Sequence, residues 1–369
     1  RSHPGNVDRS PRIVPETADP SGDAAAVTGS PTEPPVCRGD GAGAGYGMTM
    51  PVEDGLSAGQ FLALYVAAEE AGYHTALCGE VAGAEVLSLM GMAATRTRRI
   101  RLGSGILATY TRPAPLAAMG FATLASAAPG RIVAGFGASS PIIVGRWHGI
   151  EFRKPYTTTR EYLELFARAM AGGKISYDGE ELRCEGFRLE MAPPEPVPVW
   201  LGAMGDRMLA LAGTVADGAF LAWCPPGEVA TKRAVVHEAA RAAGRDPDSV
   251  ELVCSFWGYA GDRPDEARER MRRAVLAYAM VPTHQHCFAG CFPRLTEAAE
   301  AWAAGDRREA LDCVDDAVVE AVCAVGEDAV RRRVAEYRDV GIDTPILLPT
   351  GVMPGDSEGS MQTVLRCAP

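Results

Sequence analysis

Arg99-Ile-Arg-Leu-Gly-Ser-Gly-Ile-Leu-Ala-Thr-Tyr-Thr-Arg-Pro113, continued by Pro115-Leu-Ala-Ala-Met119 and Pro129-Gly-Arg-Ile-Val-Ala-Gly-Phe-Gly-Ala-Ser-Ser140, is the stretch that decides the fold. Its pattern is an apolar strand, a polar loop, a short helix, a Pro-Gly turn, a second apolar strand and a loop of small residues. These are two turns of a β/α repeat. In such folds the loops that follow the strand carboxyl ends carry the chemistry.

The same alternation continues along the chain, with helices between strands. We expect eight strands, at residues 45–50, 74–79, 100–107, 131–136, 197–202, 219–223, 249–259 and 345–348. Repeated β/α alternation implies a parallel sheet. Eight units over about 320 residues favour a closed (β/α)8 TIM barrel over an open sheet.

Three segments stand outside this repeat. Residues 1–44 contain almost no large apolar side chain. Burial of this segment would not offset the conformational entropy lost on ordering it, so we expect a flexible tail. Residues 174–189 predict a hairpin that turns at Asp178-Gly179. Residues 281–325 form an irregular, helix-prone insertion before the last unit. We therefore expect a single barrel domain over 45–369 that carries both insertions.

Composition excludes several classes of protein. A net charge of -11 argues against nucleic-acid binding, which needs clustered Lys and Arg. The chain has no apolar run of membrane-spanning length, and we expect a cytoplasmic protein whose ten scattered cysteines stay reduced. The cluster His284-Gln-His-Cys-Phe-Ala-Gly-Cys291 could supply zinc ligands. Its spacing fits no standard zinc finger, so we expect no metal there.

Two loops at strand ends have the composition of a phosphate site. The first consists of Gly137, Ala138, Ser139 and Ser140, and it offers backbone N–H groups and two hydroxyls. The second opens a helix and contributes Ala203, Met204, Gly205 and Arg207. Free N–H groups and the positive end of a helix dipole suit an anion. Either loop alone could be a plain β/α turn, but two in successive units favour a phosphate site.

Glu80 is the clearest candidate acid or base, because it follows a strand at the end where barrel catalysts lie. A carboxyl group beside an apolar ring would be desolvated and could hold a proton to donate. The alternative is a carboxylate that fixes a loop. Tyr110 could donate to a substrate or line its pocket. Trp223, Cys224 and Trp257 lie near the ends of the sixth and seventh strands, where aromatic walls suit a planar apolar substrate. Ordinary core packing is the alternative for Trp257.

The order of these motifs resembles the luciferase-like superfamily of flavin- and F420-dependent oxidoreductases. The carriers include Glu69-Glu-Ala-Gly-Tyr73, Arg96–Gly103, Gly130–Gly137, Pro198–Gly202 and Leu209–Gly218. Within the superfamily, Tyr110-Thr-Arg-Pro113 and the block 209–223 resemble the F420-dependent methylenetetrahydromethanopterin reductase-like members more than luciferase itself. The resemblance implies a cofactor ring across the strand carboxyl ends, with its phosphate at the two loops described above. It also implies a non-prolyl cis peptide in the third strand, best matched by Leu107-Ala108, and a cofactor contact by Leu107, Ala108 and Thr109.

The activity that the resemblance implies is F420-dependent oxidoreduction. We expect a reductase that passes hydride from reduced F420 to a C=C or C=N bond of a small organic substrate. One alternative is an FMN-dependent monooxygenase; another is a non-catalytic flavin-binding barrel. The run Glu80-Val-Ala-Gly83 lacks the Asp-His pair of F420-dependent sugar-phosphate dehydrogenases, so that activity is not expected. We also expect a homodimer and a separate enzyme that reduces the cofactor.

Overall fold

The structure is a computed structural model that describes residues 45–369 with the exception of residue 53. The flexible tail expected over 1–44 therefore lies outside the described residues. Within the described part, none of the helices combines the length and the apolar character needed to cross a bilayer.

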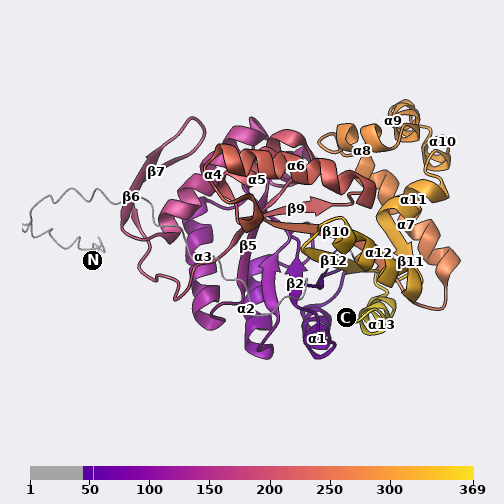
Figure 1. The fold of residues 1–369 in the computed structure, drawn as a ribbon, viewed down its shortest axis with the longest axis horizontal. Coiled ribbons are helices and arrows are strands. Elements are labelled where there is room, and N and C mark those ends of the chain that lie inside the picture. Colours follow the sequence, from indigo (N-terminus) through magenta and orange to yellow (C-terminus); the bar gives the residue numbers. More distant parts are fainter. Residues whose placement is uncertain (1–44, 53) are drawn as a thin grey trace, which may run out of the picture. The chain divides into compact units, whose positions relative to one another are not determined.

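Eight parallel strands close into a barrel (Figure 1). In order around the barrel they are β1 (Gly47–Thr49), β2 (Thr75–Cys78), β3 (Arg101–Ser104), β5 (Ile132–Gly137), β8 (Val199–Gly202), β9 (Gly218–Ala222), β10 (Glu251–Tyr259) and β12 (Thr344–Pro349). Pairing of β12 with β1, which sets Ile346 opposite Gly47, closes the ring. The predicted (β/α)8 TIM barrel is confirmed.

Two further short strands extend this sheet at the carboxyl ends of barrel strands. β4 (Leu107–Ala108) pairs with the end of β5, and β11 (Cys323–Val325) pairs with the end of β10. The sequence predicts one continuous third strand over 100–107, whereas the structure divides it into β3 and β4.

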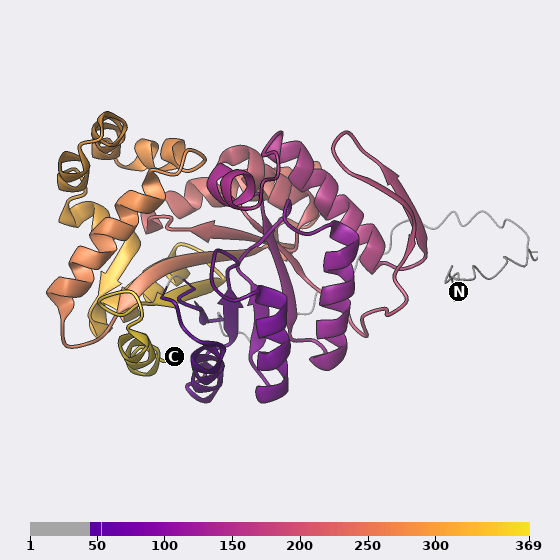
Figure 2. The same ribbon diagram turned by 180° about the vertical axis from the view of Figure 1, so that it is seen from behind.

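Helices surround the barrel (Figure 2). They are α1 (Ala58–Glu70), α2 (Val86–Arg96), α3 (Ala114–Ala127), α4 (Pro155–Met170), α5 (Asp206–Val215), α6 (Pro226–Ala242), α7 (Pro264–Ala279), α12 (Glu327–Asp339) and α13 (Ser357–Arg366). Their starts follow local rules. At α1, the Ser57 hydroxyl accepts from the Gln60 N–H while the Gln60 side chain accepts from the Ser57 N–H, which is a capping box.

Side chains that point inward from the strands fill the barrel. The interior cluster consists of Leu77, Val133, Trp200, Phe220, Val253 and Ile346, with Ile106 packed against it. Because strand side chains alternate, the outward set packs beneath the helices in a larger core. The barrel interior is therefore a packed core, and space for a ligand lies at the strand ends.

Two additions flank the barrel on opposite sides (Figures 1 and 2). One is the antiparallel pair β6 (Lys174–Asp178) and β7 (Arg183–Arg188). The other comprises α8 (Gln285–Cys291), α9 (Arg294–Ala304), α10 (Arg307–Asp312) and α11 (Asp316–Val322). Three of these helices, α9, α10 and α11, share a separate apolar cluster with α7 and the end of β10, so this part of the insertion is anchored by burial.

Candidate functional site

The site is built at the carboxyl ends of the strands, around a break between β3 and β4. A cis peptide joins Gly105 and Ile106 there, so the position predicted from the sequence, Leu107-Ala108, is wrong by two residues. Crowding explains the choice of residue: a Cβ at position 105 would lie 2.9 Å from the Cβ of Leu77, so only glycine fits. Leu107 and Ala108 instead pair in regular register with β5.

Ile106 forms the floor of the site. A Cβ at Gly137 or at Gly202 would lie 3.1 Å from the Ile106 side chain, so both glycines leave room for it at the ends of β5 and β8. Below, Ile106 contacts the interior cluster. Sequence reasoning did not identify Ile106. The available signal was the glycine that ends each of the neighbouring strands.

The two loops predicted to bind phosphate lie side by side. Register places Phe136 opposite Leu201, so residues 137–140 and 203–207 leave adjacent strands together. Ser139 has φ = 64°, a left-handed conformation that is uncommon for a residue other than glycine and is often found at functional sites.

The start of α5 offers backbone donors. Gly205 is its N-cap residue and no side chain caps this end, so the first N–H groups of the helix are available to an anion. Arg207 lies with its guanidinium 4.5 Å from the centre of the Tyr156 ring. Asp206 would repel an anion, but Lys232 lies 3.5 Å from its carboxylate and offsets that charge. Ser140 is already engaged, because its hydroxyl accepts from the Ile143 N–H at 3.3 Å.

Glu80 lies beside the floor. Its N–H donates to the Ile106 carbonyl at 3.3 Å, and its carboxylate accepts from the Val86 N–H at the start of α2. Arg112 contributes a guanidinium 3.5 Å from the Glu80 carboxylate and is itself held by Glu85 at 2.5 Å. The structure thus places Glu80 where a strand-end catalyst is expected, and adds a cation, Arg112, that the sequence analysis did not assign.

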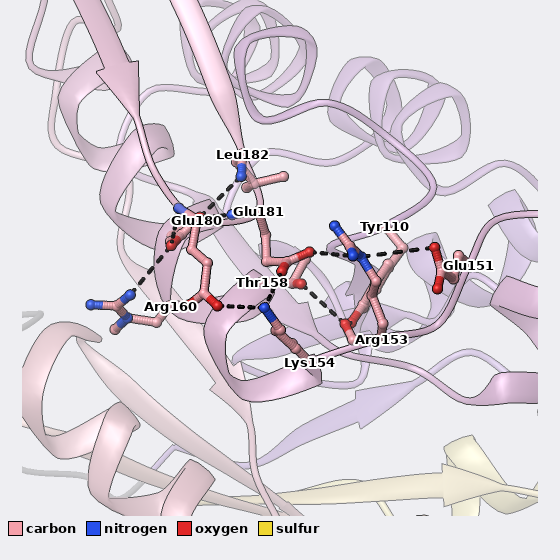
Figure 3. A network of polar contacts seen from close by, with 10 residues as sticks. Tyr110, Glu151, Arg153, Lys154, Thr158, Arg160, Glu180, Glu181 and Leu182 are labelled. Carbon is pink, nitrogen blue, oxygen red and sulfur yellow. Dashed lines mark hydrogen bonds and ion pairs between the residues drawn. The ribbon is translucent and has the colours of Figure 1, made fainter.

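The Tyr110 hydroxyl is already used in a hydrogen bond within the protein. Its hydroxyl donates to the Arg153 carbonyl at 2.6 Å, and its ring lies 5.1 Å from Phe152. Burial raises the pKa of Tyr110, so the phenol stays protonated. Figure 3 shows Tyr110 next to Arg153 in a polar network that reaches the β6–β7 turn. Thr109 pairs with Thr159 of α4, hydroxyl to hydroxyl at 3.3 Å.

Trp223 and Trp257 lie together near the strand ends, in a buried cluster to which α7 adds a third aromatic ring. Trp223 lies edge-on to Trp257 with ring centres 5.4 Å apart and stacks on Tyr278 of α7 at 4.8 Å. Trp223 has φ = 54°, which is strained for so bulky a residue. Cys224 lines a small apolar cavity with Met204, and burial raises the pKa of its thiol, so it is unsuited to nucleophilic attack.

A half-buried arginine ties two loops to α7 beside this wall. Arg270 of α7 forms an ion pair with Asp54 and donates to the carbonyls of Gly351 at 3.0 Å and Met353 at 2.9 Å. The loops after β1 and β12 are thereby fixed to α7. No local pattern signals a contact between residues so far apart in the chain.

No metal centre is found among the described residues, since nowhere in them do three His, Cys, Asp or Glu side chains gather in a way that could hold an ion. The side chain of His286, within the cluster considered from the sequence, lies outside that description.

Residues 41–344 match the family model described as luciferase-like monooxygenase. The chain belongs to this family. Its enzyme relatives include a 5,10-methylenetetrahydromethanopterin reductase of Methanolobus tindarius, 28% identical over 70% of this chain and 80% of the relative. A putative coenzyme F420-dependent oxidoreductase of Mycobacterium tuberculosis is 25% identical, over 76% and 87% of the two chains.

Solved structures show the same fold. The coenzyme F420-dependent tetrahydromethanopterin reductase of Methanopyrus kandleri superposes with a TM-score of 0.71 at 22% identity, covering 89% of this chain and all of the other. The oxygenating constituent of 3,6-diketocamphane monooxygenase of Pseudomonas putida, in complex with FMN, gives a TM-score of 0.64 at 18% identity, covering 88% and 97%. The predicted family and the prediction of an enzyme are confirmed.

Proposed function

We propose that this protein is an F420-dependent oxidoreductase that reduces a C=C or C=N bond of a small organic substrate. The observation that carries the proposal is the juxtaposition at the strand ends: an apolar floor at Ile106, two adjacent small-residue loops, and Glu80, whose backbone N–H donates to the carbonyl of the floor residue. The sequence relatives named above are described as F420-dependent or as methylenetetrahydromethanopterin reductases, which supports this choice of cofactor.

The residues present fit such a cofactor. The uncapped start of α5 and the backbone of residues 137–140 would hold its phosphate, and Ile106 would support its ring. When bound, the deazaflavin supplies the hydride. The protein holds the partners in position, and the wall of Trp223, Trp257 and Tyr278 excludes water from one side.

Glu80 handles the proton in this proposal. Reduction of a C=C or C=N bond needs a proton as well as a hydride, and Glu80 is the acidic residue whose backbone is hydrogen-bonded to the floor residue. The Arg112 guanidinium lies 3.5 Å from the Glu80 carboxylate. In this proposal Arg112, which also forms an ion pair with Glu85, holds the Glu80 carboxylate in its orientation.

The proposal extends to a partner enzyme and to the oligomeric state. A reductase of this kind consumes reduced cofactor, so a separate enzyme must regenerate it. A homodimer remains the expected assembly, which light scattering of the purified protein tests directly.

Titration of the purified protein with F420 and, separately, with FMN tests the cofactor. We expect saturable F420 binding that is at least about tenfold tighter than FMN binding. The reason is that a site specific for one cofactor makes contacts with it that the other cofactor cannot make. Oxygen-dependent product formation with reduced FMN would instead establish the monooxygenase. Tight F420 binding without turnover of any C=C or C=N substrate would favour a non-catalytic barrel.

A further inference from the structure

The first phosphate loop, residues 137–140, continues directly into a short helix. This helix is of the rare π type, η1 (Ile142–Trp147), and it precedes the loop that leads to α4. Two hydrogen bonds tie its start to Ser140. The Val144 N–H donates to the Ser140 carbonyl at 2.9 Å, and the Ile143 N–H donates to the Ser140 hydroxyl at 3.3 Å. η1 is therefore held against the residues to which the proposed function assigns the cofactor phosphate.

η1 is anchored on one side and exposed at its end. The Val144 side chain is buried, and the Val144 carbonyl accepts from the Ile150 N–H at 3.1 Å, which closes the loop behind the helix. Three large side chains then follow one another in exposed positions: Arg146, Trp147 and His148. Trp147 is 52% exposed, which is unusual for the largest apolar side chain. The packing of η1 does not account for these three side chains.

The exposed end of η1 carries positive charge that no carboxylate balances by direct contact. In the part of the chain that the structure describes, neither Arg146 nor His148 forms an ion pair. Residues 137–150 contain no Asp or Glu, although the chain as a whole has a net charge of -11. The next acidic residue, Glu151, pairs with Arg153 at 3.8 Å. Arg146 is therefore available to an anion from outside the chain.

The second phosphate loop contributes another arginine to the same region. The Arg207 guanidinium lies 4.5 Å from the centre of the Tyr156 ring, in the first turn of α4. Because α4 begins where the loop after η1 ends, this contact joins the second phosphate loop to the chain that carries Arg146. Asp206 forms its ion pair with Lys232, and among the described residues Arg207 forms none. Both phosphate loops thus lead to an arginine without a carboxylate partner.

The separation between the phosphate loop and Arg146 is short. Arg146 follows Ser140 by six residues of largely helical chain, so the two lie at most about 9 Å apart along the helix axis at a rise of about 1.5 Å per residue. A peptide chain that extends about 3.3–3.6 Å per residue bridges this distance within a few units. An anionic chain attached to a phosphate at residues 137–140 can therefore reach the Arg146 side chain.

We propose that the exposed end of η1 binds a chain of carboxylates that continues from the cofactor phosphate. The inference rests on the proposed function, since F420 carries a tail of glutamate residues beyond its phosphate and FMN does not. The Arg146 guanidinium pairs with a tail carboxylate, His148 donates from its ring N–H, and the exposed ring of Trp147 packs against tail methylene groups. The site also supplies a contact through which the protein prefers F420 to FMN, because FMN ends at its phosphate.

Equilibrium titration, followed by the fluorescence of the deazaflavin, tests the proposal with two forms of the cofactor. One is F420 with several glutamates, and the other is F420 cut back to its lactyl phosphate. At low ionic strength the long-tailed form should bind about fivefold more tightly, as for exposed ion pairs. The difference should shrink at high ionic strength, because salt screens exposed charges.

Arg146→Gln removes one charge from η1 and should weaken binding of the long-tailed form about threefold, with the short-tailed form unaffected. Arg241→Gln is the matched control. Arg241 is also exposed, but it lies in the last turn of α6, which runs back from the strand carboxyl ends to the other end of the barrel. This variant should leave the ratio of the two affinities as it is in the unaltered protein.

The possible failures are distinguishable. If both forms bind equally well, or if Arg146→Gln leaves their ratio unchanged, the tail does not contact η1 and this inference is wrong, while the proposed cofactor stands. A ratio that Arg241→Gln lowers as much as Arg146→Gln would show an effect of net charge alone and would also overturn it. If neither form binds, the proposed function fails and the inference fails with it. Thermal unfolding of each variant verifies that it is folded.

Discussion

Glu161→Gln is the substitution whose effect on stability the structure predicts most directly. The Glu161 carboxylate of α4 is buried and accepts three backbone N–H groups of the hairpin turn: Glu180 at 2.9 Å, Glu181 at 2.8 Å and Leu182 at 3.0 Å. Its two oxygens thus anchor β6 and β7 to the barrel. Glutamine has a single acceptor oxygen, so its NH2 group must face at least one of these N–H groups.

The magnitude follows from those bonds. One part-buried N–H loses its partner and the two others exchange a charged acceptor for a neutral one, which together destabilise the protein by about 3 kcal/mol. Glu164→Gln is the control. It lies one turn further along α4, also faces Arg160, and accepts a single bond from the Tyr177 hydroxyl at 2.7 Å. Its expected cost is about 1 kcal/mol.

Urea unfolding of both variants at pH 7 measures the difference. If Glu161→Gln is destabilised no more than Glu164→Gln, the three bonds do not anchor the hairpin and the reasoning is wrong. The pH dependence gives an independent check. Burial raises the pKa of Glu161, but the backbone bonds outweigh burial and lower it below the usual 4.5. A folded-state pKa below the unfolded one stabilises the protein above pH 4.5, and this contribution is lost as the pH falls through the lowered value. The difference in the free energy of unfolding between the unaltered protein and Glu161→Gln should therefore become smaller below pH 4.5.

The remaining predictions concern the candidate site. Glu80→Gln should lower turnover by about 10²–10⁴-fold while leaving F420 affinity nearly constant. Steady-state kinetics measures this effect, and near-normal turnover would show that Glu80 only fixes its loop. Gly205→Leu should weaken F420 binding, because a side chain at the N-cap would obstruct the start of α5; thermal unfolding without cofactor should barely change, and unaltered affinity would place the phosphate elsewhere. Cys224 should resist iodoacetamide at pH 8, since burial raises the pKa of its thiol, and rapid alkylation seen by mass spectrometry would contradict this.

The barrel was predictable because its signals are local. Apolar runs bounded by glycine and proline mark the strands, so the eight strands appear close to the expected residues. The cis peptide was predicted two residues from its observed position, where the residue type is determined by contact with a neighbouring strand. The cis peptide follows Gly105, and Leu77 on the adjacent strand leaves no room for a larger residue at that position.

The candidate site was predictable only in part, because its partners come from distant segments. Glu80 and the two loops were found from their positions after strands. Arg112 as the partner of Glu80 depends on a side chain crossing between loops, and Tyr278 meets Trp223 only through the packing of α7. The Asp54–Arg270 pair spans 216 residues of chain. No periodicity within one helix or strand carries information on such contacts.

The pairing of β12 with β1 has a consequence for synthesis of the chain on the ribosome. Gly47 meets Ile346 across about 300 residues, so one edge of β1 stays unpaired until almost the whole barrel has emerged. Until then β10 also lacks its neighbour β12. Exposed strand edges are sites of mispairing between chains. Nascent chains that stall before residue 344 should therefore be targets for chaperones, and release of the last strand should be the event that makes the barrel a closed, protease-resistant unit.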